Sequence, residues 1–98
     1  MKIVWSPLAV DRVFEIAEYI ALDKPSAAAD WVDTVFKSVK RLKKFPRSGR
    51  VIPEIQLDEF REIILDNYRI IYRIGEKQVS ILTVRSGREI LPVDEVLA

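Results

Sequence analysis

The chain has 98 residues, of which 49% are hydrophobic and 32% are charged, and its net charge is +1. This size and composition predict one globular domain, residues 1–98, with no apolar run near the roughly 18 residues that a membrane-spanning helix needs. The absence of cysteine and histidine excludes disulfides, the usual zinc sites and an imidazole acid or base, so we expect no metal and no cofactor in a protein suited to the reducing cytoplasm.

A short strand and a helix are predicted at the start of the chain. Residues 3–5 form an apolar run that is typical of a strand. Ser6 and Pro7 then supply an N-cap and a first-turn proline, and apolar residues recur at helical spacing as far as residue 22. Pro25 marks the end of this helix, because the residue before a proline is pushed out of the helical conformation.

A second helix is predicted over residues 25–44. Its apolar seam repeats about every seven residues and consists of Ala28, Trp31, Val32, Val35, Val39 and Leu42. We expect Trp31 to anchor this seam in the core, since a tryptophan on an apolar seam usually packs against other side chains. Two long helices joined by a short link predict an antiparallel helical hairpin.

Three strands are predicted in the second half of the chain, over residues 61–65, 69–74 and 78–85. The segments between them, residues 66–67 and 75–77, have compositions that are typical of hairpin turns. Residues 51–60 are expected to be irregular, and residues 89–98 form a short tail in which Pro92 limits regular structure. The order β-α-α-β-β-β predicts an α+β fold, with the helical hairpin packed on one face of an antiparallel sheet.

The strand over residues 69–74 has one apolar side. Alternation places Ile70, Tyr72 and Ile74 on that side. We expect it, together with Leu82 and Val84 of the next strand, to pack against four residues of the second helix: Trp31, Val35, Val39 and Leu42.

The opposite side of the same strand carries arginines and predicts a surface that binds anions. Alternation places Arg69, Ile71 and Arg73 there, and Arg85 and Arg88 follow on or just after the next strand, so we expect the four guanidinium groups to lie within a few strand spacings. Arginines on the exposed face of a strand are also ordinary solvated residues, and this interpretation stays open. The apolar residues predicted on this side, Ile71, Val79 and Ile81, would be exposed to water in an isolated monomer, which indicates a partner.

Charge is segregated along the chain. Acids outnumber bases between Asp11 and Asp33, whereas seven bases and no acid occur between Lys37 and Arg50. This pattern favours binding of polyanions or acidic surfaces. Bases in the last turn of a helix also complement its dipole, which is the alternative explanation for the cluster from Lys40 to Lys44.

Five sequence blocks in this order resemble the RelE/ParE superfamily of toxins, which come from bacterial type II toxin–antitoxin modules and are often described as plasmid stabilisation proteins. The resemblance covers nearly the whole chain and implies the same β-α-α-β-β-β fold. The blocks are Trp5-Ser6-Pro7, Phe45-Pro46-x-x-Gly49-Arg50-x-x-Pro53-Glu54, Arg61-Glu62-Ile63, Tyr68-Arg69-Ile70-Ile71-Tyr72-Arg73-Ile74, and Ile81-Leu82-x-Val84-x-x-Gly87-Arg88-x-x-Leu91-Pro92.

The resemblance implies one of two activities. The RelE branch cleaves mRNA on the ribosome, and for that activity the matching residues would be Arg69 and Arg88 as cations and Glu54 as a base. The ParE branch has a similar fold and poisons DNA gyrase without nuclease activity. This chain lacks the proton-transfer groups of the nucleases: it has no tyrosine after Tyr72, and Ser86 stands where related nucleases place a histidine. The sequence therefore favours the ParE branch, with the mRNA endonuclease or a non-toxic relative that only binds antitoxin as alternatives.

The resemblance also implies a partner, a cognate antitoxin of the ParD or RelB type. DNA gyrase would be the target, or the ribosome in the alternative interpretation, with no role for a membrane. The residues predicted to contact the antitoxin or the target are Arg50, Arg61, Arg69, Ile71, Arg73, Val79, Ile81, Arg85 and Arg88.

Overall fold

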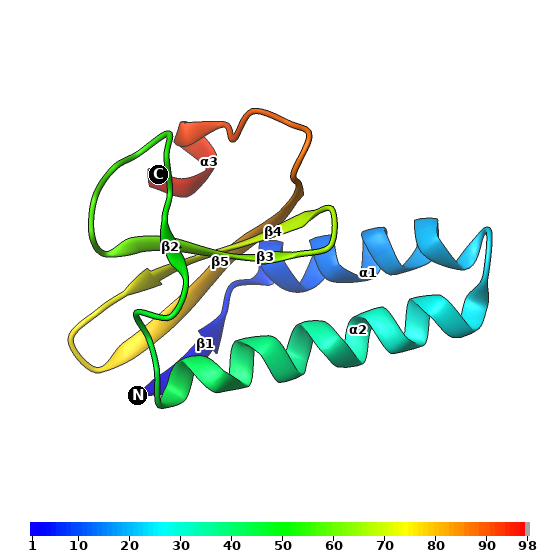
Figure 1. Ribbon diagram of the computed structural model, residues 1–98, viewed down its shortest axis with the longest axis horizontal. Coiled ribbons are helices and arrows are strands. Elements are labelled where there is room, and N and C mark those ends of the chain that lie inside the picture. The colour runs from blue at the N-terminus through cyan, green and yellow to red at the C-terminus, as the bar shows by residue number, and fades with distance from the viewer. Residues whose placement is uncertain (98) are drawn as a thin grey trace.

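The computed structural model describes residues 1–97, which form a helical hairpin, a five-stranded sheet and a short C-terminal helix (Figure 1). A 3₁₀ turn, Arg41–Lys43, follows the second helix. The α+β fold with an N-terminal hairpin on one face of the sheet is confirmed. In chain order the elements are β1 (Lys2–Trp5), α1 (Pro7–Ala21), α2 (Pro25–Lys40), β2 (Arg50–Val51), β3 (Phe60–Leu65), β4 (Tyr68–Ile74), β5 (Gln78–Ser86) and α3 (Val93–Leu97).

The hairpin forms where the capping residues predict it. The Ser6 hydroxyl oxygen accepts a hydrogen bond from the Ala9 N–H at 3.0 Å, and the same hydroxyl donates to the Leu82 carbonyl at 2.8 Å. Pro7 and Pro25 each occupy the first turn of a helix, where their missing N–H costs nothing. Ser6 therefore both starts α1 and attaches this helix to the sheet.

The sheet is mixed because its first strand runs parallel to its last. The strand order is β1-β5-β4-β3-β2, with β1 parallel to β5 and the other neighbours antiparallel. The prediction of an antiparallel sheet therefore holds for four of the five strands. Strand β2, which the sequence did not predict, adds two residues at the edge of β3.

The main core lies between the helical hairpin and one face of the sheet. Trp31 is 7% exposed there, and its ring lies 5.2 Å from that of Tyr68 in an edge-on arrangement. The predicted packing of Ile70, Tyr72 and Val84 against α2 is confirmed. The helix residues in this core include Ala9, Val13, Trp31, Val35, Val39 and Leu42.

The predicted faces of β5 are partly wrong because this strand contains a bulge. Tyr72 pairs with Ile81 but Ile71 pairs with Thr83, so Leu82 is an extra residue opposite the β4 backbone. Val79 and Ile81 before the bulge face the hairpin, as Val84 does after it, and Leu82 packs on the opposite face. Val79 and Ile81 are therefore fully buried in the main core and do not lie exposed beside the arginines.

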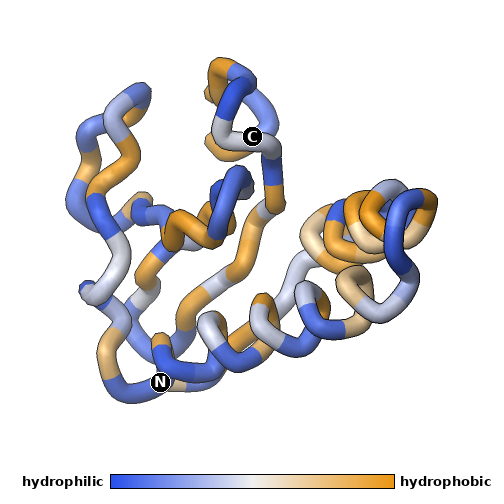
Figure 2. Tube along the Cα trace, turned by 45° about the vertical axis from the view of Figure 1, so that its right-hand side comes forward, coloured by the Kyte–Doolittle hydropathy of each residue, from blue (hydrophilic) through white to orange (hydrophobic). Residues whose placement is uncertain are grey.

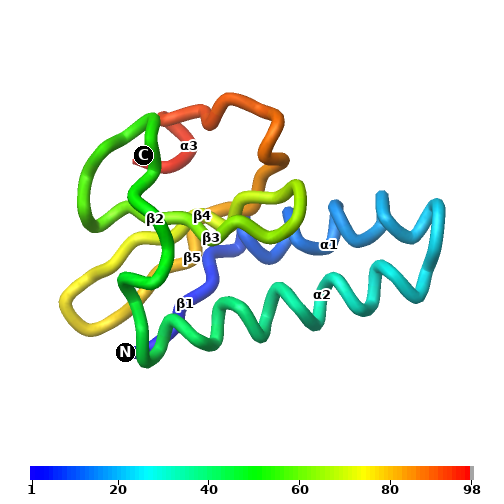
Figure 3. Tube along the Cα trace, viewed as in Figure 1, coloured from blue at the N-terminus to red at the C-terminus, as the bar shows by residue number. Residues whose placement is uncertain are grey.

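The second face of the sheet is covered by the C-terminal tail and the segment between β2 and β3. Figure 3 shows this tail crossing the sheet on the side away from α1 and α2. Ile71 is fully buried in this second core, so the prediction that it is exposed is wrong. The other buried members are Ile52, Phe60, Leu91 and Val96, and Val96 belongs to α3. No helix within residues 1–97 is both long enough and apolar enough to cross a membrane.

Candidate functional site

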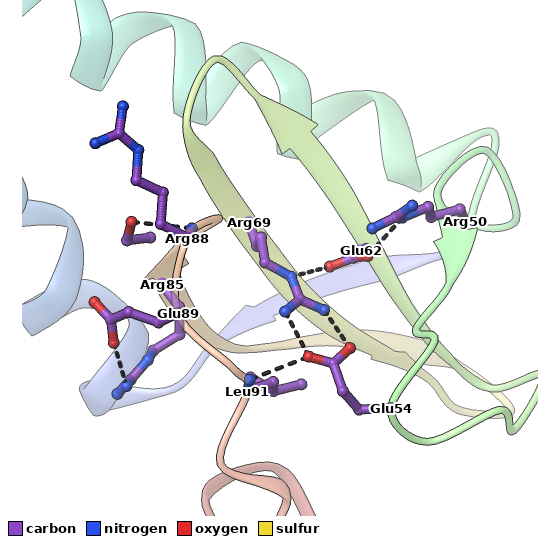
Figure 4. Close-up of polar contacts among 9 residues, drawn as sticks. Arg50, Glu54, Glu62, Arg69, Arg85, Arg88, Glu89 and Leu91 are labelled. Carbon is purple, nitrogen blue, oxygen red and sulfur yellow. Dashed lines mark hydrogen bonds and ion pairs between the residues drawn. The ribbon is translucent and has the colours of Figure 1, made fainter.

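Arg69 of β4 is the centre of a buried network of ion pairs on the second face of the sheet (Figure 4). Its two terminal nitrogens donate to the two carboxylate oxygens of Glu54 at 2.7 and 2.8 Å, and its Nε donates to Glu62 at 2.5 Å. The hydrogen bonds from Arg69 to Glu54, together with the one to Glu62, raise the pKa of Arg69 further above its usual range. Arg69 is therefore a fixed structural cation and not the exposed residue that alternation predicted.

Glu62 holds two arginines from its position in the middle of β3. Its side chain is fully buried, and it accepts from Arg50 Nε at 2.6 Å as well as from Arg69. Glu62 pairs across the sheet with Ile71, so it lies on the same face as the Arg69 side chain. A buried carboxylate needs such partners, because an isolated one loses its hydration without compensation.

Glu54 comes from the segment after β2 and closes the network from the other side. Its Oε2 also accepts the Leu91 N–H at 3.1 Å, which ties the C-terminal tail to Arg69. The hydrogen bonds from Arg69 are the main cause that lowers the pKa of Glu54 to about 2. Glu54 is therefore a poor proton acceptor near neutral pH, contrary to its candidate role as a nuclease base.

A second network neutralises Arg85. Its terminal nitrogens donate to Glu89 at 2.6 Å and to Glu95 at 3.2 Å, and Glu95 also accepts from Arg12 of α1 at 3.0 Å. The pairs with Glu95 join α1, β5 and α3. Arg85 lies directly opposite Arg69 in the sheet register, yet the two cations pair with separate sets of carboxylates.

Arg61 and Arg73 do not join the Arg69 network. Arg61 pairs across the sheet with Tyr72, which faces the main core, and it bonds Asp58 and the carbonyl of Gly49. Arg73 is exposed, and its guanidinium carbon lies 5.7 Å from the centre of the Phe60 ring. The predicted convergence of arginines is therefore real only in part.

A groove of about 630 Å³ lies beside Arg69, between the β3–β4 turn and the tail. Arg50, Glu54, Arg69 and Arg88 line it, as do Ile64 and Ile90. Arg88 makes no ion pair within residues 1–97, and Figure 4 shows its side chain pointing away from the Arg69–Glu54 pair. Of the three arginines that line this groove, Arg88 is thus the one without a carboxylate partner within residues 1–97, and it is available for an external anion.

The site offers little for acid–base chemistry. Tyr72 is fully buried; its hydroxyl donates to the Pro46 carbonyl at 2.7 Å and accepts from the Gly49 N–H at 2.9 Å. Burial raises the pKa of the Tyr72 hydroxyl. No group of three or more carboxylates within the described residues could hold a metal ion.

The sequence interpretation missed the carboxylates that pair with the arginines. Glu62 carried a usable signal, because the register of two neighbouring strands places it on the Arg69 face. Glu95 carried none, since its partner Arg85 is reached only through the folding of the tail over the sheet, whereas Glu89 lies only four residues after Arg85.

Comparison with known proteins gives consistent results. The family model described as the ParE toxin of the type II toxin–antitoxin system parDE matches residues 3–91. The chain is 37% identical over 93 residues to "Putative toxin Y4kP" of Sinorhizobium fredii (strain NBRC 101917 / NGR234), and the match covers 93% of each chain.

Two solved structures have a similar fold. One is the chromosomal ParDE toxin–antitoxin system from P. aeruginosa, with a TM-score of 0.72 and 22% identity over 88% of this chain and 95% of that chain. The other is the toxin–antitoxin complex RelBE2 from Mycobacterium tuberculosis, with a TM-score of 0.55 and 21% identity over 87% of this chain and 95% of that chain. At these identities the two structures support the fold alone.

Proposed function

Because this chain belongs to the ParE family of toxins from type II toxin–antitoxin systems, we propose that it inhibits DNA gyrase in the bacterial cytoplasm and is neutralised by a cognate antitoxin. The alternative is a ribosome-dependent mRNA endonuclease of the RelE type. The proposal for gyrase goes beyond family membership and depends on what the site can do chemically.

The pairing of Arg69 with Glu54 is the observation that carries this proposal. Cleavage of a phosphodiester without a metal needs free cations and a group that transfers protons. Arg69 donates its hydrogen bonds to Glu54 and Glu62, and those to Glu54 help to lower the pKa of Glu54 to about 2. Two of the three residues that the nuclease alternative would use, Arg69 and Glu54, are thus paired with each other, which favours a toxin that acts by binding its target.

The antitoxin is proposed to bind the helical hairpin, because Ile71, Val79 and Ile81, which were expected to form an exposed apolar surface beside the arginines, are all fully buried. The hairpin carries a hollow of about 310 Å³ lined by small and apolar side chains, among them Phe14, Ala28 and Val32. Leu22 near the end of the hairpin is 85% exposed, and Figure 2 shows hydrophobic positions recurring along α1. Such a surface suits an apolar segment of a partner.

Two assays run side by side test the target. The purified toxin should inhibit supercoiling by DNA gyrase and should leave mRNA intact in a ribosome cleavage reaction. Addition of the antitoxin encoded beside the gene should restore supercoiling. Cleavage of mRNA only when ribosomes are present would refute the proposal in favour of the RelE type, and inactivity in both assays with intact antitoxin binding would identify a non-toxic relative.

Arg88 provides a matched pair of variants for the same assays. Arg88 and Arg73 are both exposed arginines without an ion pair within residues 1–97, but only Arg88 lines the groove. We expect Arg88→Ala to reduce inhibition strongly and Arg88→Lys nearly as much, since a bidentate contact needs guanidinium geometry. Arg73→Ala should remain active, and equal loss in both variants would mean that overall charge and not the groove matters.

A further inference from the structure

The largest group of unpaired positive charges lies at the end of α2, away from the groove. We call the surface formed by Lys37, Lys40, Arg41, Lys43 and Lys44 the basic end of α2. All five residues are exposed, and only Lys37 has a carboxylate partner within residues 1–97, Asp33 at 2.9 Å. Figure 1 shows the C-terminal end of α2 at the bottom of the view and the tail that follows β5 along the top.

Aromatic side chains are interspersed among these bases. Phe45 is 60% exposed and forms part of a hollow of about 330 Å³ with the five basic residues. Next to it, Lys40 and Lys43 border a hollow of about 300 Å³ that also contains Trp5 and Phe36. The Trp5 and Phe36 rings pack against each other at 4.9 Å, while Phe36 remains 40% exposed.

The helix dipole explains only part of this arrangement, because only Lys37 and Lys40 of the five bases lie in the last turn of α2. A base that serves the dipole lies in the last turn and meets the free carbonyls of the helix. Here the Arg41 carbonyl accepts the backbone N–H groups of Lys44 and Phe45, and the Lys43 carbonyl accepts from Met1 N. Lys43 and Lys44 also follow the last residue of α2, so their charges add to a surface beyond the helix.

We propose that the basic end of α2 binds single-stranded nucleic acid. The lysine and arginine side chains that have no carboxylate partner would contact successive phosphates, and Phe45 would stack on a nucleobase between those phosphates. A positively charged surface with exposed aromatic rings is suited to a single strand, whose bases are free to stack. In a duplex the nucleobases are already stacked on each other, so they are not free to stack on the Phe45 ring. This inference does not rest on gyrase as the target.

Fluorescence anisotropy with a labelled oligodeoxynucleotide of mixed sequence tests the proposal on the full chain. We expect binding that weakens with salt, with a slope of roughly −0.7 for each phosphate neutralised on a single strand, or about −3 for four contacts. The same oligonucleotide in duplex form should bind several-fold more weakly. Equal or tighter binding of the duplex would overturn the proposed stacking.

Two sets of variants separate the contributions of charge and stacking. Replacing Lys40, Lys43 and Lys44 together by Gln should weaken binding at least tenfold and reduce the salt slope. Lys43→Gln should weaken binding more than Lys24→Gln, which removes an exposed lysine at the other end of α2 that has no ion pair within residues 1–97. Phe45→Leu should weaken binding about fivefold with an unchanged salt slope, whereas Phe45→Tyr should bind as wild type does, since stacking needs a ring.

The controls identify outcomes that would contradict the proposal. Thermal unfolding of each variant should match wild type, because all substituted side chains are exposed. Wild-type binding by the triple Gln variant would place the site elsewhere. Competition by polyglutamate as effective as competition by unlabelled oligonucleotide would show a surface for acidic protein. Gyrase inhibition by a toxin that binds no oligonucleotide would overturn this inference and leave the proposed function standing.

Discussion

Replacing Arg69 by Met should destabilise the fold through the charge that it leaves behind. The Arg69 side chain is 7% exposed and donates three hydrogen bonds to two carboxylates. Glu54 is partly exposed and regains water when Arg69 is removed, but the Glu62 side chain is fully buried and keeps only Arg50. Removing one partner of a buried pair costs roughly 3–5 kcal/mol, and the remaining Arg50 contact favours the lower end, about 3 kcal/mol.

Urea unfolding followed by tryptophan fluorescence measures this effect. A loss of about 3 kcal/mol in a domain of this size should also lower the melting temperature by roughly 12–24 °C. Arg73→Met is the matched control, because Arg73 lies on the same strand but is exposed, and its loss should cost less than about 1 kcal/mol. Equal effects of the two substitutions would refute the argument.

Combining Arg69→Met with Glu62→Met shows whether the loss of stability comes from the unpaired Glu62 charge or from lost packing of the Arg69 side chain. If the buried Glu62 carboxylate causes the loss, replacing it by an apolar residue in the Arg69→Met background should restore stability by roughly 2 kcal/mol. A double variant that is less stable than Arg69→Met would show that packing and not charge is responsible.

Three further outcomes are expected. Stability should fall by about 2 kcal/mol as the pH drops from about 5 towards 2.5, because folding lowers the pKa of Glu54 from 4.5 to about 2. The stabilisation by the Glu54 carboxylate is present above its unfolded pKa and is lost as the carboxylate is protonated. In urea unfolding across this pH range, Glu54→Gln should lack this part of the pH dependence. Trp31→Ala should cost roughly 3–5 kcal/mol as a truncation in the main core, and an unchanged urea midpoint would contradict the helix-on-sheet packing. Gly49→Ala should cost about 1–3 kcal/mol in the same assay, because an added Cβ would lie 2.5 Å from the Tyr72 hydroxyl oxygen, and wild-type stability would show that this loop can move.

The parts of the fold with local signals were predictable from the sequence. Ser6 and Pro7 start α1 where the capping pattern predicts, and Trp31 anchors the hairpin seam. The faces of β5 were not predictable, because strict alternation assumes no inserted residue and Leu82 is one. No residue type at that position marks a bulge, so the assignment of Val79 to the arginine side followed from a rule that this strand does not obey.

The candidate site was harder to predict because its partners are distant in the sequence. Arg69 and Arg88 were identified from alternation and from the resemblance to toxins, but whether each is free depends on side chains elsewhere. Arg69 meets Glu54, which lies 15 residues away in an irregular segment, whereas Arg88 follows the last strand and has no ion pair within residues 1–97. Composition makes the two arginines equivalent, and only the path of the chain distinguishes them.

The parallel pairing of β1 with β5 has a consequence for how the protein is made. Lys2 pairs with Gln78 and Trp5 pairs with Ile81, so β1 cannot pair until β5 has been synthesised. Pairings this distant in sequence are slow to form because a long loop must close first. The two helices can meet early, but the sheet that covers their apolar face is complete only when almost all of the chain has been synthesised. Until β5 has been synthesised, the apolar face of the hairpin lacks the sheet that covers it and the complete fold cannot form.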